Sequence, residues 1–402
     1  MPTLQLDLLQ TLTLAGVVYF IGVQLCRRIG WLDRLNIPPA VVGGLLFTLL
    51  AMLAHSRGGE VRLDTSAQTV LIVAFFTTIG MGASLALLRR GGMQVAVFLL
   101  FATVFCFVQN GLGIAIATAF GEHPLLGVMA GSVTLVGGPA TGLAFAPLFE
   151  EAGLAGAGAI ALTAATVGIV CGGLVGGPVG TYLTRRFHLR PATRSSAERA
   201  PELEAPTETI VVEVDREDNV VFRNLVVLAV AMGLGSIVSG YIRSTGLTLP
   251  SYIGAMLVAS VLRNVDDATG RLQIDPRVMD FIGNLALNVF LVVALMDLKL
   301  WLLAGLAVPL FTILAAQVVV VVLAALTISF VLMGRDYDSA VMASGFVGFV
   351  LGTTANAMAN MRALVGRFGA APRAFLVVPL VGALFIDFTN AIIITVFVNW
   401  FR

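Results

Sequence analysis

Charge is scarce in this chain of 402 residues: 12% of the residues are Asp, Glu, Lys or Arg, whereas 58% are hydrophobic. A soluble domain carries about 25% charged residues. Acidic and basic side chains nearly balance, with a net charge of +1, so the composition gives no sign of nucleic-acid binding. The low charge predicts a protein that crosses a membrane several times.

Cysteine and histidine are also rare, with three of each. The cysteines lie in apolar segments without the spacing of a metal site, which is typical of small core residues. The sequence contains no nucleotide-binding loop, zinc motif or catalytic triad. We therefore expect neither an enzyme nor a cofactor.

Apolar segments fill both halves of the chain, and about 20 such residues suffice to cross a bilayer. A polar stretch at 187–219, rich in proline and acidic residues, separates the halves and predicts a flexible linker. We expect spans at 6–26, 36–55, 69–88, 93–120 and 155–184 in the N-terminal unit 1–186, and at 221–241, 249–263, 280–297, 301–333 and 374–400 in the C-terminal unit 220–402.

One further apolar stretch, 124–149, is interrupted at its centre by the sequence Gly-Gly-Pro-Ala-Thr-Gly at 137–142. Glycine and proline remove helix propensity, and proline also removes a backbone donor. Broken backbone at membrane depth is tolerated only where protein or a watery cavity covers it. We therefore predict a helix that enters the membrane, breaks and returns, with free backbone groups at its tip.

A second interrupted stretch lies at 338–362, where residues 341–343 repeat the Val-Met-Ala of residues 128–130. Glycines and hydroxyl residues follow, up to Thr353 and Thr354, and then Asn356. Broken polar segments at corresponding places in two halves are the best sequence indication of a transporter binding site. The alternative is a pair of glycine-rich helices that merely pack closely.

The basic residues support the hairpin interpretation independently. With the N-terminus outside and both hairpins returning to their own side, nineteen of the 24 Lys and Arg residues fall inside, as the positive-inside rule requires. If 124–149 spanned the membrane instead, ten of the eleven arginines from Arg185 to Arg277 (all but Arg243) would lie outside. Five spans and one hairpin per half then predict an all-α fold of ten transmembrane helices in two inverted repeats, which suits alternating access.

Asp387 is the sharpest single signal, because a carboxylate near the middle of a span costs at least about 2.5 kcal/mol. A cation would neutralise it, and Thr389 and Asn390 add oxygen ligands. Gln109 and Gln317, in the spans that precede the hairpins, should face the hairpin tips. The alternatives are a structural acid bonded to a neighbouring helix and amides that join helices.

Several longer motifs are specific: Ala359-Asn-Met361, Arg367-Phe-Gly369, Ala374 to Pro379, Phe385-Ile-Asp387 and Asn390-Ala391, with Gln109-Asn110, Gly137-Gly138 and Thr141-Gly142 in the first half. Through these motifs the chain resembles the bacterial glutamate:sodium symporter family nearly end to end. The resemblance implies sodium-coupled glutamate uptake by a homodimer, with a mobile transport domain sliding against a scaffold in an elevator motion. The tips depart from the family pattern at Val136, Pro139 and Ala140 and at Phe346, Val347 and Val350, which makes them more apolar.

We therefore expect a symporter that imports glutamate or a related small anionic amino acid or carboxylate, with Na+ as the coupling ion. The bacterial inner membrane would hold it, surrounded by lipid, with both termini outside and the linker in the cytoplasm. Two alternatives remain open: a proton-coupled transporter of another small organic anion, and a ligand-binding membrane sensor that does not transport. The expected substrate-binding residues are Ser132, Thr134, Gly137, Gly138, Thr141, Gly348, Gly352, Thr353, Thr354 and Asn356, and the expected sodium-binding residues are Asp387, Thr389, Asn390, Gln109 and Gln317.

Overall fold

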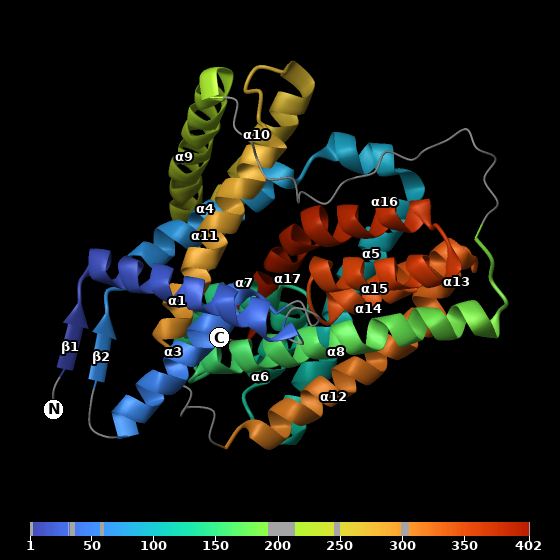
Figure 1. Cartoon of the computed structure of the whole chain (residues 1–402), viewed down its shortest axis with the longest axis horizontal. Helices are drawn as coiled ribbons and strands as arrows, with labels where there is room; N and C mark the ends of the chain where they lie inside the picture. The colour runs from blue at the N-terminus through green and yellow to red at the C-terminus, as the bar shows by residue number, and fades with distance from the viewer. Residues whose placement is uncertain are drawn as a thin grey trace.

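The protein is built almost entirely from helices (Figure 1). The structure is a computed structural model that describes residues 3–30, 32, 37–56, 60–191, 214–244, 250–298 and 305–401. Most of the predicted linker, from residue 192 to residue 213, therefore lies outside the described residues. Within them, seven helices are long and apolar enough to cross a membrane: Leu8–Arg28, Gly92–Ala119, Ala157–Arg186, Val220–Ile242, Pro276–Met296, Ala307–Leu332 and Pro372–Trp400. The prediction of a polytopic helical membrane protein is confirmed.

Three further predicted spans coincide with helices that do not meet the length or polarity expected of a span. Residues 36–55 and 69–88 overlap the shorter apolar helices Pro39–Leu53 and Ala67–Gly82, and residues 249–263 overlap Ser251–Thr269. The number of ten spans therefore stays a prediction.

One group of helices packs together around α11. It consists of α1 (Leu8–Arg28), α3 (Pro39–Ser56), α4 (Ala67–Gly82), α9 (Val214–Ser244), α10 (Ser251–Thr269) and α11 (Pro276–Met296). Helix α1 begins at a capping box, in which the Asp7 side chain accepts from the backbone N–H of Gln10 and the Gln10 side chain accepts from that of Asp7. We call these six helices the first body.

The remaining helices form a second body, on the right of Figure 1. Its members from the N-terminal half are α5 (Leu85–Ala119), α6 (Pro124–Val128), the π-helical turn Met129–Val133, α7 (Gly138–Glu151) and α8 (Ala157–Arg186). Those from the C-terminal half are α12 (Ala307–Ala324), the π-helical turn Ala325–Ser329, α13 (Phe330–Leu332), α14 (Tyr337–Val350), α15 (Thr354–Phe368), α16 (Pro372–Leu380), the π-helical turn Val381–Phe385 and α17 (Ile386–Trp400). Each body thus contains helices from both halves of the chain.

The all-α prediction needs one correction. Strands β1 (Thr3–Leu6) and β2 (Glu60–Leu63) pair in parallel, with Thr3 opposite Glu60 and Leu6 opposite Leu63. A strand of four residues is too short to give a readable alternation, and the pairing joins segments more than fifty residues apart. The short sheet lies beside the start of α1, away from the second body (Figure 1).

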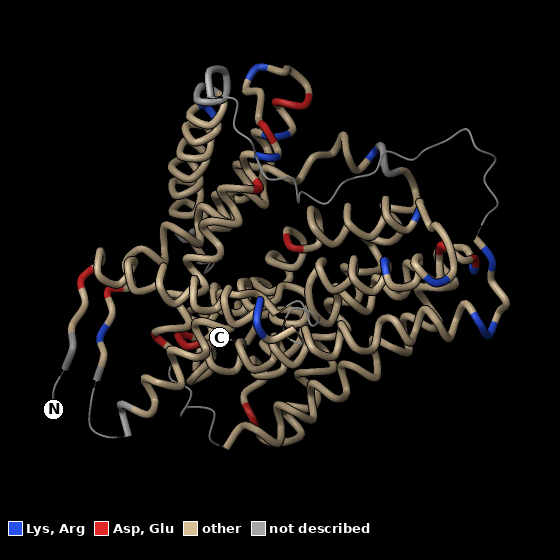
Figure 2. Tube along the Cα trace, viewed as in Figure 1, with Lys and Arg blue, Asp and Glu red and all other residues tan. Residues whose placement is uncertain are grey.

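Charged residues lie mostly at helix ends and in connections, while the central parts of the helices carry few of them (Figure 2). Arg373 and Asp336 form an ion pair, with 2.6 Å between Nη2 and Oδ1, at the base of the hairpin α14–α15. Arg263 and Asp267 pair at 3.1 Å near the end of α10. This sorting is expected of a protein whose helix centres contact hydrocarbon.

Candidate functional site

The first predicted break is present, and it begins earlier than the Gly-Gly-Pro sequence. Gly131 has a non-helical backbone (φ −102°, ψ −130°) inside the π-helical turn Met129–Val133. A Cβ at this position would lie 2.7 Å from the Asn110 Oδ1 atom, so only glycine admits the asparagine. In return, Asn110 Oδ1 accepts a hydrogen bond from the Ser132 N–H at 2.9 Å and satisfies one group that the break leaves free.

Buried amide side chains link the break to α17 and link the neighbouring helix α5 to α12 and α14. The Asn390 Nδ2 group of α17 donates to the Ser132 carbonyl at 2.9 Å. Gln317 Nε2 of α12 donates to the Gln109 carbonyl at 2.7 Å, and Gln109 Nε2 donates to the Val350 carbonyl at 3.3 Å, at the end of α14. Gln109 therefore reaches the end of α14, beside the second break, whereas Gln317 contacts α5, so the prediction that Gln317 faces a tip stays a prediction.

Several polar atoms of this network have no partner in the described part of the chain. They are Gln109 Oε1, Gln317 Oε1, Asn390 Oδ1, Ser132 Oγ and Asn110 Nδ2, and all are buried. Buried polar atoms almost always find a partner, so this set of atoms is where a water, an ion or a ligand group could bind. Four of the five are oxygens, which are the donors that hard cations prefer.

Asp387 lies one helical turn before Asn390, directly after the π-helical turn Val381–Phe385. Its side chain is half-buried, and no described residue bonds or pairs with its carboxylate. Thr389 Oγ1 donates to the Ile386 carbonyl at 3.1 Å and lies 3.4 Å from Thr103 Oγ1 on α5. Sequence reasoning missed Thr103, because a single hydroxyl in an apolar span carries no signal.

The turn that precedes α7 lies beside the turn that precedes α15. Gly138, the first residue of α7, has a φ of +67°, and a Cβ there would lie 3.8 Å from the Gly352 carbonyl oxygen and 3.9 Å from Thr353 Cγ2. Thr353 caps α15, with its side chain accepting from the Asn356 N–H at 3.4 Å. The N-termini of α7 and α15 therefore converge on one place.

Other predicted substrate ligands of the second hairpin make contacts within the protein. Thr354 Oγ1 donates to the Gly382 carbonyl at 2.6 Å. Asn356 Nδ2 donates to the Ile169 carbonyl of α8 at 2.7 Å, and its Oδ1 atom is an orphan. A Cβ on Gly348 would lie 2.5 Å from Ala357 Cα, so this glycine lets the two arms of the hairpin touch.

The remaining candidates shape the first tip. Thr134 Oγ1 donates to the Met129 carbonyl at 2.7 Å, across the π-helical turn. Thr141 lies directly over Gly137, where a Cβ would be 2.6 Å from Thr141 Oγ1. Both threonines are buried and hold the broken segment in its conformation.

Comparison with known proteins identifies the family of this chain. The family model described as "Sodium/glutamate symporter" matches residues 4–370. The sodium/glutamate symporter of Escherichia coli (strain K12) is 39% identical over 396 residues, which cover 98% of this chain and 97% of the relative. That of Haemophilus influenzae is 37% identical over 389 residues, 96% of each chain. On this evidence, the chain belongs to the sodium/glutamate symporter family.

Proposed function

We propose that this protein is a sodium-coupled symporter that imports glutamate or a related small anionic amino acid by alternating access. The observation that carries the proposal is the set of orphaned oxygens at the break of the first hairpin, on Gln109, Gln317, Asn390 and Ser132. Sodium is a hard cation and would satisfy such oxygens. Its charge would also compensate the half-buried carboxylate of Asp387, one turn away.

The meeting tips supply the substrate site of this proposal. Two helix N-termini, at Gly138 and Thr354, face one region, and each presents free backbone N–H groups and the positive end of a helix dipole. Such ends bind carboxylates, and glutamate carries two. The Asn110 Nδ2 orphan adds a donor close by. The names of the relatives, sodium/glutamate symporters, agree with this substrate class.

We further propose that one body of helices moves relative to the other during transport. Each body contains helices from both halves: α1, α3 and α4 pack with α9, α10 and α11, while α5–α8 pack with α12–α17. This pattern suits two inverted five-helix repeats with re-entrant hairpins, and it suits a transport domain that slides against a scaffold. The second body holds all the candidate ligands, so we assign it as the mobile domain. A homodimer in the bacterial inner membrane, with termini outside and the linker inside, completes the proposal.

The decisive experiment is uptake of radiolabelled L-glutamate into liposomes that contain the purified full chain. We expect accumulation with an inward sodium gradient and none with a matched potassium gradient. Accumulation driven by a proton gradient without sodium would instead establish the proton-coupled alternative. Ligand binding without accumulation under any gradient would establish the sensor alternative.

The choice among substrates needs a second series of measurements. The side chains of Val136 and Ala140 make the first tip apolar, and both are buried. Unlabelled aspartate, glutamine and small dicarboxylates should be tested as competitors of glutamate. We expect competition from molecules with two negative charges and little from glutamine, because two helix N-termini converge at the tips.

A further inference from the structure

A groove of about 710 Å³ opens between the C-terminal turns of α8 and α15. It lies in the second body, at the opposite end of α15 from the hairpin tips, and contains none of the candidate ligands. Its wall is almost entirely apolar and includes Pro178, Tyr182 and Leu364, while arginines occupy its rim. A groove of this size is within the usual range for small-molecule sites.

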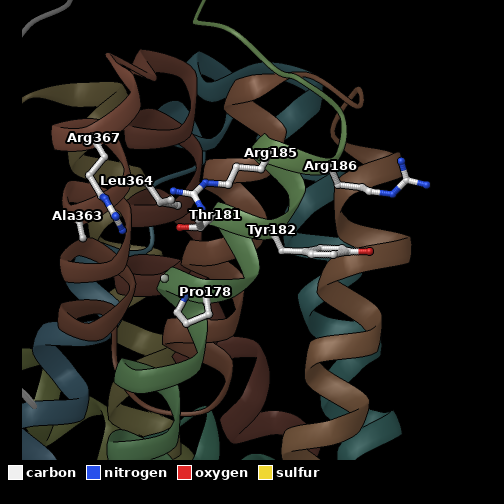
Figure 3. Close-up of a pocket in the computed structure, with 9 residues that line it drawn as sticks. Pro178, Thr181, Tyr182, Arg185, Arg186, Ala363, Leu364 and Arg367 are labelled. Carbon is white, nitrogen blue, oxygen red and sulfur yellow. The ribbon is translucent and has the colours of Figure 1, made fainter.

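Three arginines line the groove: Arg185 and Arg186 from the last turn of α8 and Arg367 from the last turn of α15. Figure 3 shows the Arg185 and Arg367 side chains pointing toward one another, while Arg186 and Tyr182 extend to the other side of α8. All three arginines are exposed, and none forms an ion pair with a described carboxylate. Arg186 instead lies over the Phe187 ring, with Cζ 6.0 Å from the centroid.

A simpler explanation for these residues is the helix dipole, which favours a cation in the last turn. That effect accounts for one arginine on each helix, but the dipole interaction is just as good when the side chains diverge. Arg185 and Arg367 converge although like charges repel. The two guanidinium groups converge over an apolar groove, and no described carboxylate pairs with them. An anionic ligand bound between them would stabilise this arrangement.

The apolar wall of the groove indicates that the anionic group belongs to a molecule with an apolar part. Gly177 and Arg185 both line it and are eight residues apart on α8, which is about 12 Å along the helix axis. Helix α8 is one of the candidate membrane spans, and Tyr182 is an exposed aromatic residue near its end, as in an interfacial belt. The groove thus runs from the interfacial arginines toward the hydrocarbon.

We propose that this groove binds an anionic phospholipid, with the phosphate between Arg185 and Arg367 and an acyl chain along Gly177 and Pro178. Basic pockets between membrane helices recognise such headgroups through charge, while the apolar wall accepts the chain. A free phosphate would satisfy the arginines but would leave the apolar wall exposed. The lipid would move with the second body.

The charge half of the proposal is tested by native mass spectrometry of the full chain titrated with phosphatidylglycerol or phosphatidylcholine. We expect selective binding of phosphatidylglycerol, and a loss of about 25-fold in affinity for the double variant Arg185→Gln/Arg367→Gln, at about fivefold per arginine. The matched control is Arg27→Gln/Arg28→Gln, two exposed arginines in the last turn of α1. Equal losses in both double variants, or no preference for the anionic lipid, would overturn the proposal.

The apolar half is tested without changing charge. A Cβ on Gly177 meets nothing within 4 Å, so Gly177→Leu fits the fold and fills the groove. We expect it to weaken phosphatidylglycerol binding at least fivefold, whereas Gly233→Leu, an exposed glycine of α9 with equal space, should have no effect. Inorganic phosphate at millimolar concentration should not displace the lipid. Displacement by phosphate, or unchanged binding in Gly177→Leu, would show a soluble-anion site and contradict the proposal.

Discussion

The Asn390 side-chain amide donates a hydrogen bond of 2.9 Å to the Ser132 carbonyl, which joins the last helix of the chain to the break in the first hairpin. The two residues are 258 positions apart and come from opposite halves. The bond adds to those that the Ser132 carbonyl accepts from the Val136 and Gly137 N–H groups, at 3.2 and 3.1 Å, and it leaves Asn390 Oδ1 as an orphan. Asn390 therefore has two roles: its Nδ2 group helps to hold the broken segment, and its Oδ1 atom is one of the oxygens that we assign to sodium.

Replacing Asn390 with alanine should impair both roles. The Ser132 carbonyl would lose one hydrogen bond but keep those from the Val136 and Gly137 N–H groups, so we expect a cost of about 0.5–1.5 kcal/mol of folding free energy. We expect a lower melting temperature in detergent and a loss of sodium-dependent uptake of at least about tenfold. The control is Asn399→Ala, because Asn399 donates to the Thr395 carbonyl of its own helix at 2.8 Å, away from the break. Similar uptake by the two variants would contradict the role of Asn390.

Replacing Asp387 with asparagine tests the cation assignment. The variant keeps the size of the side chain but removes the charge that we expect sodium to neutralise. Because no described residue bonds to this carboxylate, little folding energy should be lost. We expect sodium to stop raising the melting temperature, and uptake to fall at least about tenfold.

The control for Asp387→Asn is Glu150→Gln, an exposed carboxylate near the end of α7. It should leave both the sodium-induced stabilisation and the uptake unchanged. If Asp387→Asn keeps full sodium-dependent uptake, Asp387 does not bind the coupling ion. The orphaned amide oxygens would then have to hold it alone.

Asp336 should contribute to stability in a pH-dependent way. Burial raises the pKa of Asp336, but hydrogen bonds from Ser339 and the Arg373 guanidinium outweigh it, and the pKa lies below its usual value. A carboxyl whose pKa is depressed by folding stabilises the protein above its unfolded pKa of about 3.9, and loses that effect as the pH falls through the folded pKa.

The variant Asp336→Asn should therefore lower stability by less than about 1 kcal/mol at pH 7, because the pair with Arg373 is partly exposed. Asparagine still caps α14, so the change isolates the charge. The difference from the wild type should shrink below about pH 4. Thermal unfolding at pH 7 and pH 3.5 measures it, with Asp7→Asn, the N-cap of α1, as the control. A difference that does not change with pH would disprove the charge effect.

Much of the candidate site could be predicted because buried polarity in a membrane is costly. Gln109, Gln317 and Asn390 are such residues: Asn390 binds the first break, Gln109 binds the end of α14 beside the second, and Gln317 binds the Gln109 carbonyl. The glycines of the two interrupted stretches predicted that these helices would be broken. They did not fix where the first helix breaks, because Gly131 and the Gly-Gly-Pro sequence are equally good breakers, and only the contact with Asn110 selects Gly131.

Other features depend on tertiary contacts that leave no local pattern. Asn356 looks like a ligand in sequence, yet its amide binds the Ile169 carbonyl of another helix. Gly348 looks like a flexible tip residue but is a contact point for Ala357. The parallel pairing of β1 and β2 joins two short segments that are far apart in the chain.

Gly138 is the position where backbone conformation and the meeting of the tips coincide, so Gly138→Ala tests the substrate site. Its φ of +67° costs a residue with a Cβ about 1–2 kcal/mol, although the space around the new atom is ordinary. The strain should displace the N-terminus of α7 from the second tip and raise the KM for glutamate. Gly153→Ala is the matched control, because Gly153 also has a positive φ (+102°) and ordinary space around a new Cβ, 3.7 Å from His123 Nε2, but follows the other end of α7. Both variants should melt at lower temperatures, and only Gly138→Ala should alter uptake. If the two reduced uptake equally, the loss would reflect stability alone, and the converging helix N-termini would not be the substrate site.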